Sequence, residues 1–109
     1  MSRERDSRPL SPNATLLLQA VEQGHAYGFD LMEVAALPSG TVYPLLRRLE
    51  ARGLVSSRWE DQEESAADGR PRRRYYQVTV AGREALPAAL ARLRTRRRVL
   101  EGLLEERER

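Results

Sequence analysis

The stretch from Leu37 to Val55 reads LPSGTVYPLLRRLEARGLV and contains one helix together with the signals that start and end it. Leu37 precedes a proline and therefore avoids helical backbone angles, and Ser39 follows as a candidate N-cap. Gly53 ends the helix. Four apolar residues repeat at the spacing of a single buried helix face: Val42, Leu45, Leu46 and Leu49. We therefore expect a helix over residues 40–52 with an apolar inner face and a polar outer face.

Two shorter helices are expected before this one. Ser11 and Pro12 are a typical helix start, because serine caps free N–H groups and proline suits the first helical position. The first helix covers residues 13–23 and the second covers residues 27–35. The candidate core residues of the second helix are Phe29, Leu31, Met32 and Ala35. Only about four residues separate the second helix from the third, which is the sequence form of a helix-turn-helix.

The hydrophobic period changes from about four to two after Gly53, which predicts β-strands. The expected strands cover residues 54–60 and 74–80, and the second is rich in aromatic and β-branched residues. Residues 61–73 between them are almost entirely polar, so we expect a hairpin with a long, exposed tip. A last helix starts near residue 79 or 81 and runs to the C-terminus.

The order of these elements predicts the fold class. It is mainly α with a two-stranded β-wing: a winged helix-turn-helix followed by a long C-terminal dimerisation helix. Residues 11–80 form the winged domain and residues 81–109 form the last helix. Residues 1–10 are polar and aperiodic, and are either a plain disordered tail or a flexible basic arm that touches phosphates.

The last helix carries a heptad seam interrupted by one arginine. The seam residues are Leu86, Leu90, Leu93, Arg97, Leu100 and Leu104. At ~1.5 Å per residue this helix spans about 42 Å, which is more than so small a domain can cover. We therefore expect the same helix of a second copy to cover the seam, in a homodimer. Arg97 either snorkels or pairs with Glu101 or Glu105 across that dimer.

Composition excludes several classes of protein. The 109 residues include no cysteine and one histidine, which excludes disulfides, thiolate catalysis, cysteine-ligated metals and a multi-histidine metal site in one chain. We therefore expect no enzyme activity, no metal and no cofactor. No apolar run approaches a membrane span or a signal peptide, so we expect a cytoplasmic protein. The chain has 19 basic residues, all of them arginine, and 16 acidic residues, which gives a net charge of +3. Because this net charge is small, the positions of the arginines say more about a polyanionic partner than their number does.

Long strings of this sequence resemble the DNA-binding half of PadR-type transcriptional regulators over about residues 10–86. The most specific are SGTVYPLLRRLE at residues 39–50 and GRPRRRYY at residues 69–76, with further matches at residues 26–31 and 79–83. The resemblance implies a dimeric repressor or activator that binds an inverted repeat in a promoter. Its members differ in the C-terminal half, and this chain resembles the short type with one dimerisation helix. It departs from the family pattern in a second helix that is unusually brief.

A recognition helix enters the major groove with its N-terminal end, which here carries small hydroxyl side chains and one glycine. The candidate DNA-binding residues of the third helix are Ser39, Gly40, Thr41, Tyr43, Pro44, Arg47 and Arg48. The resemblance implies that Tyr43 faces DNA, and packing into the core is the alternative. Ser39 also serves as an N-cap. Arg47 and Arg48 either contact DNA or form surface ion pairs with Glu50 or Glu33.

The wing supplies a second set of candidates. They are Arg70, Arg72, Arg73 and Arg74. Such a loop reaches the minor groove or the flanking phosphates, and Pro71 stiffens it. The alternative is a solvated loop whose arginines pair with the acidic stretch at residues 60–64. A further arginine cluster at residues 92–98 lies on the last helix, where a role in DNA binding is the less favoured alternative.

These features predict a sequence-specific DNA-binding regulator, a repressor that acts as a homodimer on an inverted-repeat operator in double-stranded DNA. A small apolar or aromatic effector is a further candidate partner, in a cleft lined by Leu86, Leu90, Leu93 and the leucines of the first helix. The alternative for these leucines is that they are core and seam only. Two other functions stay open: a winged-helix module that binds another protein, and a nonspecific architectural DNA binder.

Overall fold

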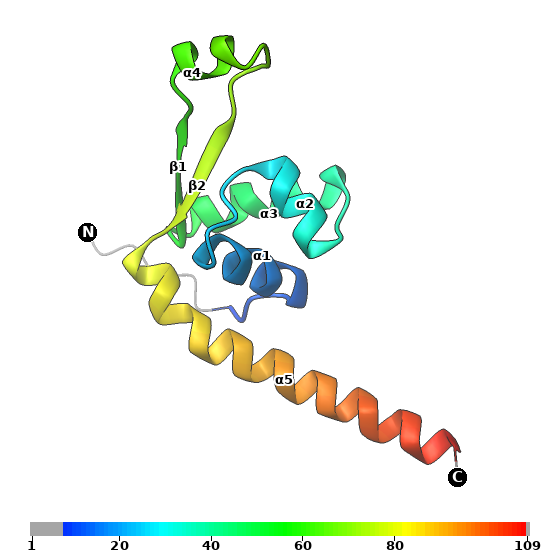
Figure 1. Cartoon of the computed structure of the whole chain (residues 1–109). Helices are drawn as coiled ribbons and strands as arrows, with labels where there is room; N and C mark the ends of the chain where they lie inside the picture. The colour runs from blue at the N-terminus through cyan, green and yellow to red at the C-terminus, as the bar shows by residue number, and fades with distance from the viewer. Residues whose placement is uncertain (1–7, 109) are drawn as a thin grey trace, which may run out of the picture.

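The computed structural model describes residues 8–108, which form helices and one two-stranded sheet (Figure 1). The elements in chain order are α1 (Pro12–Glu22), α2 (Gly28–Ala35), α3 (Ser39–Ala51), β1 (Val55–Trp59), α4 (Gln62–Ala67), β2 (Arg74–Val78) and α5 (Val80–Glu108). This arrangement confirms the fold class, which is mainly α with a two-stranded wing and a long last helix. It also confirms the start of α1, where the Ser11 hydroxyl accepts a hydrogen bond from the Ala14 N–H at 3.1 Å.

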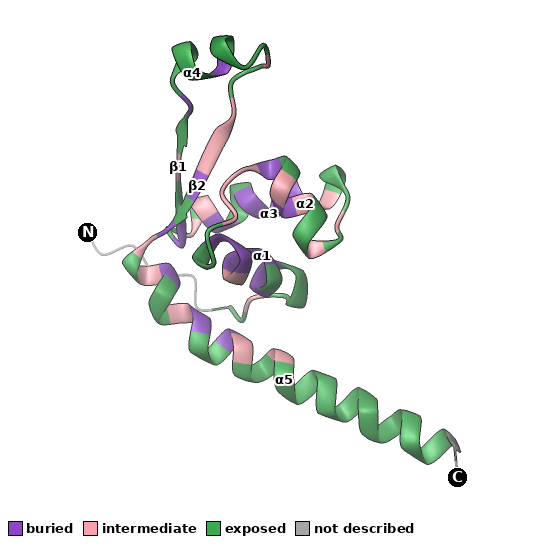
Figure 2. Cartoon of the chain, viewed as in Figure 1, coloured by how far each residue is buried: buried purple, intermediate pink, exposed green. Residues whose placement is uncertain are grey.

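The core lies where α1, α2 and α3 meet the base of the wing and the first turns of α5 (Figure 2). All four residues of the apolar face expected on α3 are buried. The largest apolar side chains with essentially no exposure are Leu17, Leu18, Leu31, Val42, Leu46, Leu49 and Val55. Leu10, which precedes α1, also packs against this cluster. Residues 1–7 of the expected arm lie outside the described part of the chain.

The wing is an antiparallel pair in which Val55 lies opposite Val78 at the base and Trp59 lies opposite Arg74 near the tip. The middle of β2 is tied to the loop between α1 and α2, because the Tyr76 N–H donates to the Ala26 carbonyl at 2.6 Å. The loop therefore extends the sheet by one short bridge. This contact fixes the angle between the wing and the helices.

The first turn of α5 packs directly on the backbone that enters the wing. The Thr79 hydroxyl accepts from the Gly82 N–H at 3.1 Å and donates to the Gly53 carbonyl at 2.6 Å. A Cβ atom on Gly82 would overlap the Leu54 carbonyl oxygen and lie 2.7 Å from a methyl group of Val78. The absence of a side chain at Gly82 therefore allows α5 to approach the wing base.

Helix α4 was not expected, because residues 61–73 lack the apolar periodicity of a helix. Its first turn is stabilised instead by Asp61, whose carboxylate accepts a hydrogen bond from the Glu63 N–H at 3.0 Å. The Ser65 hydroxyl donates to the Gln62 carbonyl at 3.0 Å within the same turn. The tip of the wing is therefore a folded unit and not an extended loop.

Three residues differ from their expected positions. Ser39 is not the N-cap of α3: Pro38 holds that position in extended backbone, and no side chain caps the helix. Phe29 was expected in the core but is 63% exposed, since the buried face of the short α2 is centred on Leu31. Leu86 was expected in the dimer seam but is buried in the core of its own chain.

Candidate nucleic-acid interface

Helix α3 presents one face to the core and the other to solvent. The open face carries the residues expected there, either exposed or half-buried: Ser39, Gly40, Thr41, Tyr43, Pro44, Arg47 and Arg48. Within residues 8–108, neither Arg47 nor Arg48 pairs with an acidic side chain. Glu50, their expected partner, instead accepts from the Ser57 hydroxyl at 2.5 Å and lies 3.7 Å from the Arg74 guanidinium. Both arginines of α3 are therefore available to a partner.

The position of Tyr43 depends on a glycine in the neighbouring helix. A Cβ atom on Gly28 would lie 2.5 Å from the Tyr43 hydroxyl oxygen and 2.6–2.7 Å from two carbons of its ring. The ring of Tyr43 thus lies flat against the start of α2, while 41% of the residue stays exposed. Packing against Gly28 therefore holds the side chain, and part of the residue remains open to solvent.

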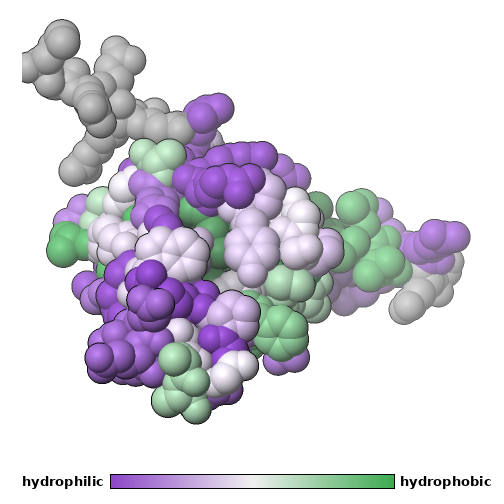
Figure 3. All heavy atoms as spheres, turned by 90° about the horizontal axis from the view of Figure 1, so that it is seen from above, coloured by the Kyte–Doolittle hydropathy of each residue, from purple (hydrophilic) through white to green (hydrophobic). Residues whose placement is uncertain are grey.

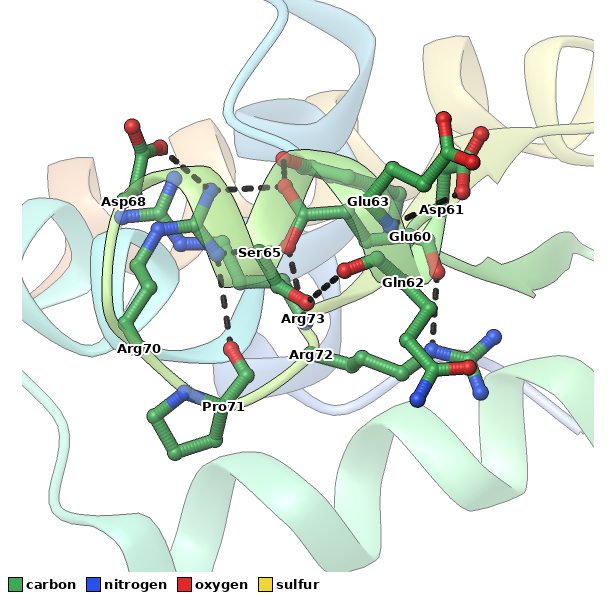
Figure 4. A network of polar contacts seen from close by, with 11 residues as sticks. Glu60, Asp61, Gln62, Glu63, Ser65, Asp68, Arg70, Pro71, Arg72 and Arg73 are labelled. Carbon is green, nitrogen blue, oxygen red and sulfur yellow. Dashed lines mark hydrogen bonds and ion pairs between the residues drawn. The ribbon is translucent and has the colours of Figure 1, made fainter.

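A buried ion pair holds the tip of the wing (Figure 4). Glu60 is only 1% exposed, and both of its carboxylate oxygens accept from the Arg70 guanidinium, at 2.5 and 2.7 Å. The Tyr75 hydroxyl donates to the same carboxylate at 2.8 Å, and the Arg73 N–H donates to it at 3.3 Å. Four donor groups, from Arg70, Arg73 and Tyr75 on the second limb of the hairpin, therefore converge on one carboxylate of the first limb, which is the arrangement that makes a buried charge tolerable.

The ion pair changes the expected role of Arg70. Its guanidinium points into the wing and also lies 3.2 Å from Asp68. The acidic stretch before the tip thus neutralises one of the four wing arginines, as the alternative interpretation expected. We leave Arg70 out of the proposed interface and treat it as a residue that supports the shape of the wing.

The hydrogen bonds from Arg70 and Tyr75 lower the pKa of Glu60 from 4.5 to about 2, against the opposing effect of burial. A carboxyl group whose pKa is lower in the folded than in the unfolded chain stabilises the folded state. The stabilisation is complete above about pH 4.5, the pKa in the unfolded chain, and is lost as the pH falls towards 2. We expect the carboxyl ¹³C signal of Glu60 to titrate with a midpoint near 2 in NMR spectra. A midpoint near 4.5, the value expected for a free carboxyl, would show that the ion pair does not form in solution.

The other three wing arginines lie beside aromatic rings. The guanidinium of Arg73 lies 4.1 Å from the centre of the Tyr27 ring, while those of Arg72 and Arg74 lie 5.9 and 5.2 Å from the centre of the Trp59 ring. Such cation–π contacts orient a guanidinium without neutralising its charge. The wing therefore presents Arg72 and Arg73 without an acidic side-chain partner within residues 8–108, while Arg74 also lies 3.7 Å from the Glu50 carboxylate of α3.

A cleft of about 1000 Å³ separates α3 from the wing. Its walls come from the start of α2, the open face of α3 and both wing strands, and include Tyr43, Arg47, Trp59, Arg72 and Arg74. Seen from the wing end, this side of the molecule shows mainly hydrophilic side chains surrounding paler and more hydrophobic ones (Figure 3). The cleft thus combines positive charge with aromatic surface.

Sequence reasoning missed several residues of this cleft. The helical spacing of α2 assigns Phe29 to the core, and the sequence pattern gives neither Trp59 nor Gly28 a role in binding. Each becomes relevant only through a contact with an element distant in the sequence. Alternation along β1 places Trp59 on the same face as the buried Val55, so the strand pattern contained no signal of its exposure either. The helical pattern of α2 contained no signal that would have placed Phe29 at the surface.

The distal half of α5 leaves the rest of the chain. The buried face of α5 ends in the region of Leu86 and Leu90, and beyond it four large apolar side chains are more than half exposed: Val99, Leu100, Leu103 and Leu104. Figure 3 shows this apolar surface on the protruding helix. Arg97 is 80% exposed and pairs with Glu101 of the same helix at 3.2 Å. This ion pair lies within one helix, and the expected snorkelling of Arg97 or its pairing with Glu101 or Glu105 across a dimer stays a prediction.

Comparison with known proteins gives a consistent result. The model of the transcriptional regulator PadR-like family matches residues 17–88. The transcriptional regulator Rv3488 of Mycobacterium tuberculosis is 46% identical over 67 residues, which are 62% of this chain and 50% of that relative. The chain thus spans about half the length of this curated relative.

Two solved structures extend the comparison. A PadR family transcriptional regulator from Eggerthella lenta is 31% identical with a TM-score of 0.60, and the match covers 84% of this chain and 82% of that one. A PadR family transcription regulator from Clostridium difficile matches 86% of this chain and 99% of its own, with 24% identity and a TM-score of 0.70.

None of the helices formed by residues 8–108 combines the length and apolar character needed to cross a membrane.

Proposed function

The chain belongs to the PadR-like family of transcriptional regulators, and from this premise we propose that it binds double-stranded DNA in a sequence-specific manner, as a homodimer and without catalytic activity. The observation that carries the proposal is the pairing of an open α3 face with three arginines across one cleft. Arg47 and Arg48 extend this positive surface along α3. This distribution of charge matches the phosphate backbone beside a major groove.

In the proposed complex the N-terminal end of α3 enters the major groove. Its first residues carry short side chains, so the backbone approaches the base edges closely. The Thr41 hydroxyl and methyl groups and the Tyr43 hydroxyl offer contacts that depend on base identity. The sugar–phosphate strand at the edge of the groove lies in the cleft, between Arg47 on α3 and Arg72 and Arg74 on the wing.

Substitution of the α3 tip tests sequence specificity. Thr41→Val and Tyr43→Phe should each weaken binding to the operator by roughly 5–100-fold, equivalent to about 1–3 kcal/mol for a lost base contact, and leave binding to random duplex nearly unchanged. Fluorescence anisotropy with the two duplexes at the same salt concentration measures both effects. Gly28→Ala should resemble Tyr43→Phe, because the new methyl group displaces the Tyr43 ring.

The operator itself is found by footprinting the protein on the DNA just upstream of its own gene. Protection of two half-sites about one helical turn apart would support an inverted-repeat operator, and overlap with the promoter would support a repressor. Equal affinity for this DNA and for random duplex would favour an architectural binder. Absence of any salt-sensitive DNA binding would favour a module that binds proteins.

The exposed leucines of α5 support the dimer. Each leucine buried at an interface contributes about 1.5–3 kcal/mol, and a two-fold dimer buries every such residue twice. Leu100→Ala with Leu104→Ala should therefore raise the dimer dissociation constant by at least on the order of 100-fold in sedimentation experiments. Arg94→Ala serves as the control on the same helix. An unchanged constant in the double variant would place the interface elsewhere.

A further inference from the structure

A buried acid lies in the most basic part of the wing. Glu60 follows β1 on the first limb and faces residues 70–75 of the second limb, which include four arginines. Its carboxylate cancels the charge of one of them and so weakens the attraction between the wing and a polyanion. The burial of Glu60 among several donors therefore calls for a role other than charge.

Glu60 binds the limb that carries the wing arginines through its backbone as well as its side chain (Figure 4). Its N–H donates to the Arg73 carbonyl at 2.7 Å, and the Arg73 N–H donates back to the Glu60 carboxylate at 3.3 Å. The Glu60 carbonyl accepts from the Nε of Arg72 at 2.9 Å. Glu60 is thus bonded directly to both of the wing arginines that lack an acidic partner within residues 8–108.

The guanidinium of Arg73 is held through two aromatic rings. The Tyr75 hydroxyl donates to the Glu60 carboxylate at 2.8 Å, and the Tyr75 ring meets the Tyr27 ring edge-on, with 6.0 Å between their centres. The Arg73 guanidinium lies 4.1 Å from the centre of that Tyr27 ring. The carboxylate therefore fixes one of the two rings that form the surface beneath the cation.

We propose that Glu60 is a positioning residue for DNA binding, which holds Arg72 and Arg73 in the arrangement that contacts phosphates. This role rests on the proposed function. Ordering long side chains before association removes an entropy cost that binding otherwise includes. Charge alone predicts the opposite result for Glu60→Gln, because the amide leaves Arg70 uncompensated and makes the wing more positive.

The sign of the effect of Glu60→Gln on DNA binding is the first test. At 0.1 M salt we expect at least tenfold weaker binding to random duplex in fluorescence anisotropy, which is about the contribution of one phosphate contact. The slope of log Kobs against log salt should fall by about 0.9 for each arginine that no longer contacts a phosphate. Tyr75→Phe removes one bond to Glu60 at constant charge and should cause a smaller loss.

Glu63→Gln is the matched control, because it removes an exposed acid of α4 and changes the net charge equally. This variant should bind duplex as tightly as the original protein or slightly more tightly. A loss in Glu63→Gln as large as that in Glu60→Gln would overturn the positioning role.

A double-variant cycle distinguishes positioning from a general effect on the wing. In a protein that already carries Arg72→Gln and Arg73→Gln, the further change Glu60→Gln should cause no additional loss of affinity. Equal losses in this background and in the original protein would show that Glu60 only maintains the fold of the wing.

The order of Arg72 is measured without DNA. Its Nε–H gives a ¹H–¹⁵N signal, and the heteronuclear NOE of that signal reports motion on the picosecond to nanosecond timescale. We expect a high NOE in the original protein and a clear decrease in Glu60→Gln, towards the value of the exposed Arg94. An unchanged NOE would overturn the positioning role.

The outcomes also separate this role from the proposed function. Duplex binding by Glu60→Gln that equals or exceeds that of the original protein would overturn the role of Glu60 and leave the proposed function intact. Absence of duplex binding by the original protein would refute the proposed function, and the role of Glu60 with it.

Discussion

Replacing Arg72, Arg73 and Arg74 together by glutamine should weaken binding to every duplex, operator or random, by on the order of 10²–10³-fold at 0.1 M salt. Each phosphate contact contributes about tenfold at this concentration and about 0.9 to the slope of log Kobs against log salt. The loss is uniform across sequences because these side chains lie on the wing, away from the tip of α3. The slope should fall by up to about three, measured by anisotropy from 50 to 200 mM salt.

A matched variant distinguishes the effect of the wing arginines from the effect of net charge alone. Substituting Arg94, Arg96 and Arg98 by glutamine removes the same three charges from α5, which extends away from the wing (Figure 1). This control should keep most of the affinity and most of the salt dependence. Equal losses in the two triple variants would show that net charge, and not the wing, drives association. No loss in the wing variant would refute the interface.

Replacing Gly82 by alanine should destabilise the fold by about 2–3 kcal/mol. Overpacking typically costs 1–3 kcal/mol, and here the obstacle is the Leu54 backbone carbonyl, which already accepts the Thr79 N–H at 3.1 Å and cannot turn away without losing that bond. The estimate of 2–3 kcal/mol is a net value, because alanine also favours the helix by about 1 kcal/mol relative to glycine and so offsets part of the cost of the clash. For a domain of this size the melting temperature should drop by roughly 10 °C or more in circular dichroism.

Gly102 provides the control for this prediction. It lies in the same helix, and a Cβ atom there would meet nothing within 4 Å. Gly102→Ala should therefore leave stability unchanged or raise it by up to about 1 kcal/mol through helix propensity. If Gly82→Ala melted at the temperature of the original protein, α5 would not be packed against the wing base as described.

The sequence was sufficient for elements whose cause is local. The i, i+3, i+4, i+7 pattern of α3 and the Ser11 cap of α1 appear in the structure within one or two residues of their expected positions. The pattern also predicted the wing, because alternation begins directly after Gly53. The same pattern was less accurate for α2. Eight residues contain too few turns to distinguish the buried side of a helix from its exposed side, and Phe29 was therefore wrongly placed in the core.

Contacts between distant elements could not be predicted in this way. Helix α4 has no apolar face, so its stability comes from Asp61 at its start and from the Glu60–Arg70 pair beneath it. The packing of Tyr43 on Gly28 joins two helices whose relative angle no local pattern contains. Both features shape the candidate interface, and the roles of its individual residues stay predictions until DNA binding is measured.

The hydrogen bonds that hold residues 60–72 at the tip of the wing all arise within the hairpin, whereas Arg73 and Arg74 below the tip contact Tyr27 and Glu50. The tip is thus a self-contained cassette. Its length and charge can vary in evolution, or be exchanged between regulators in the laboratory, without repacking the domain that carries it.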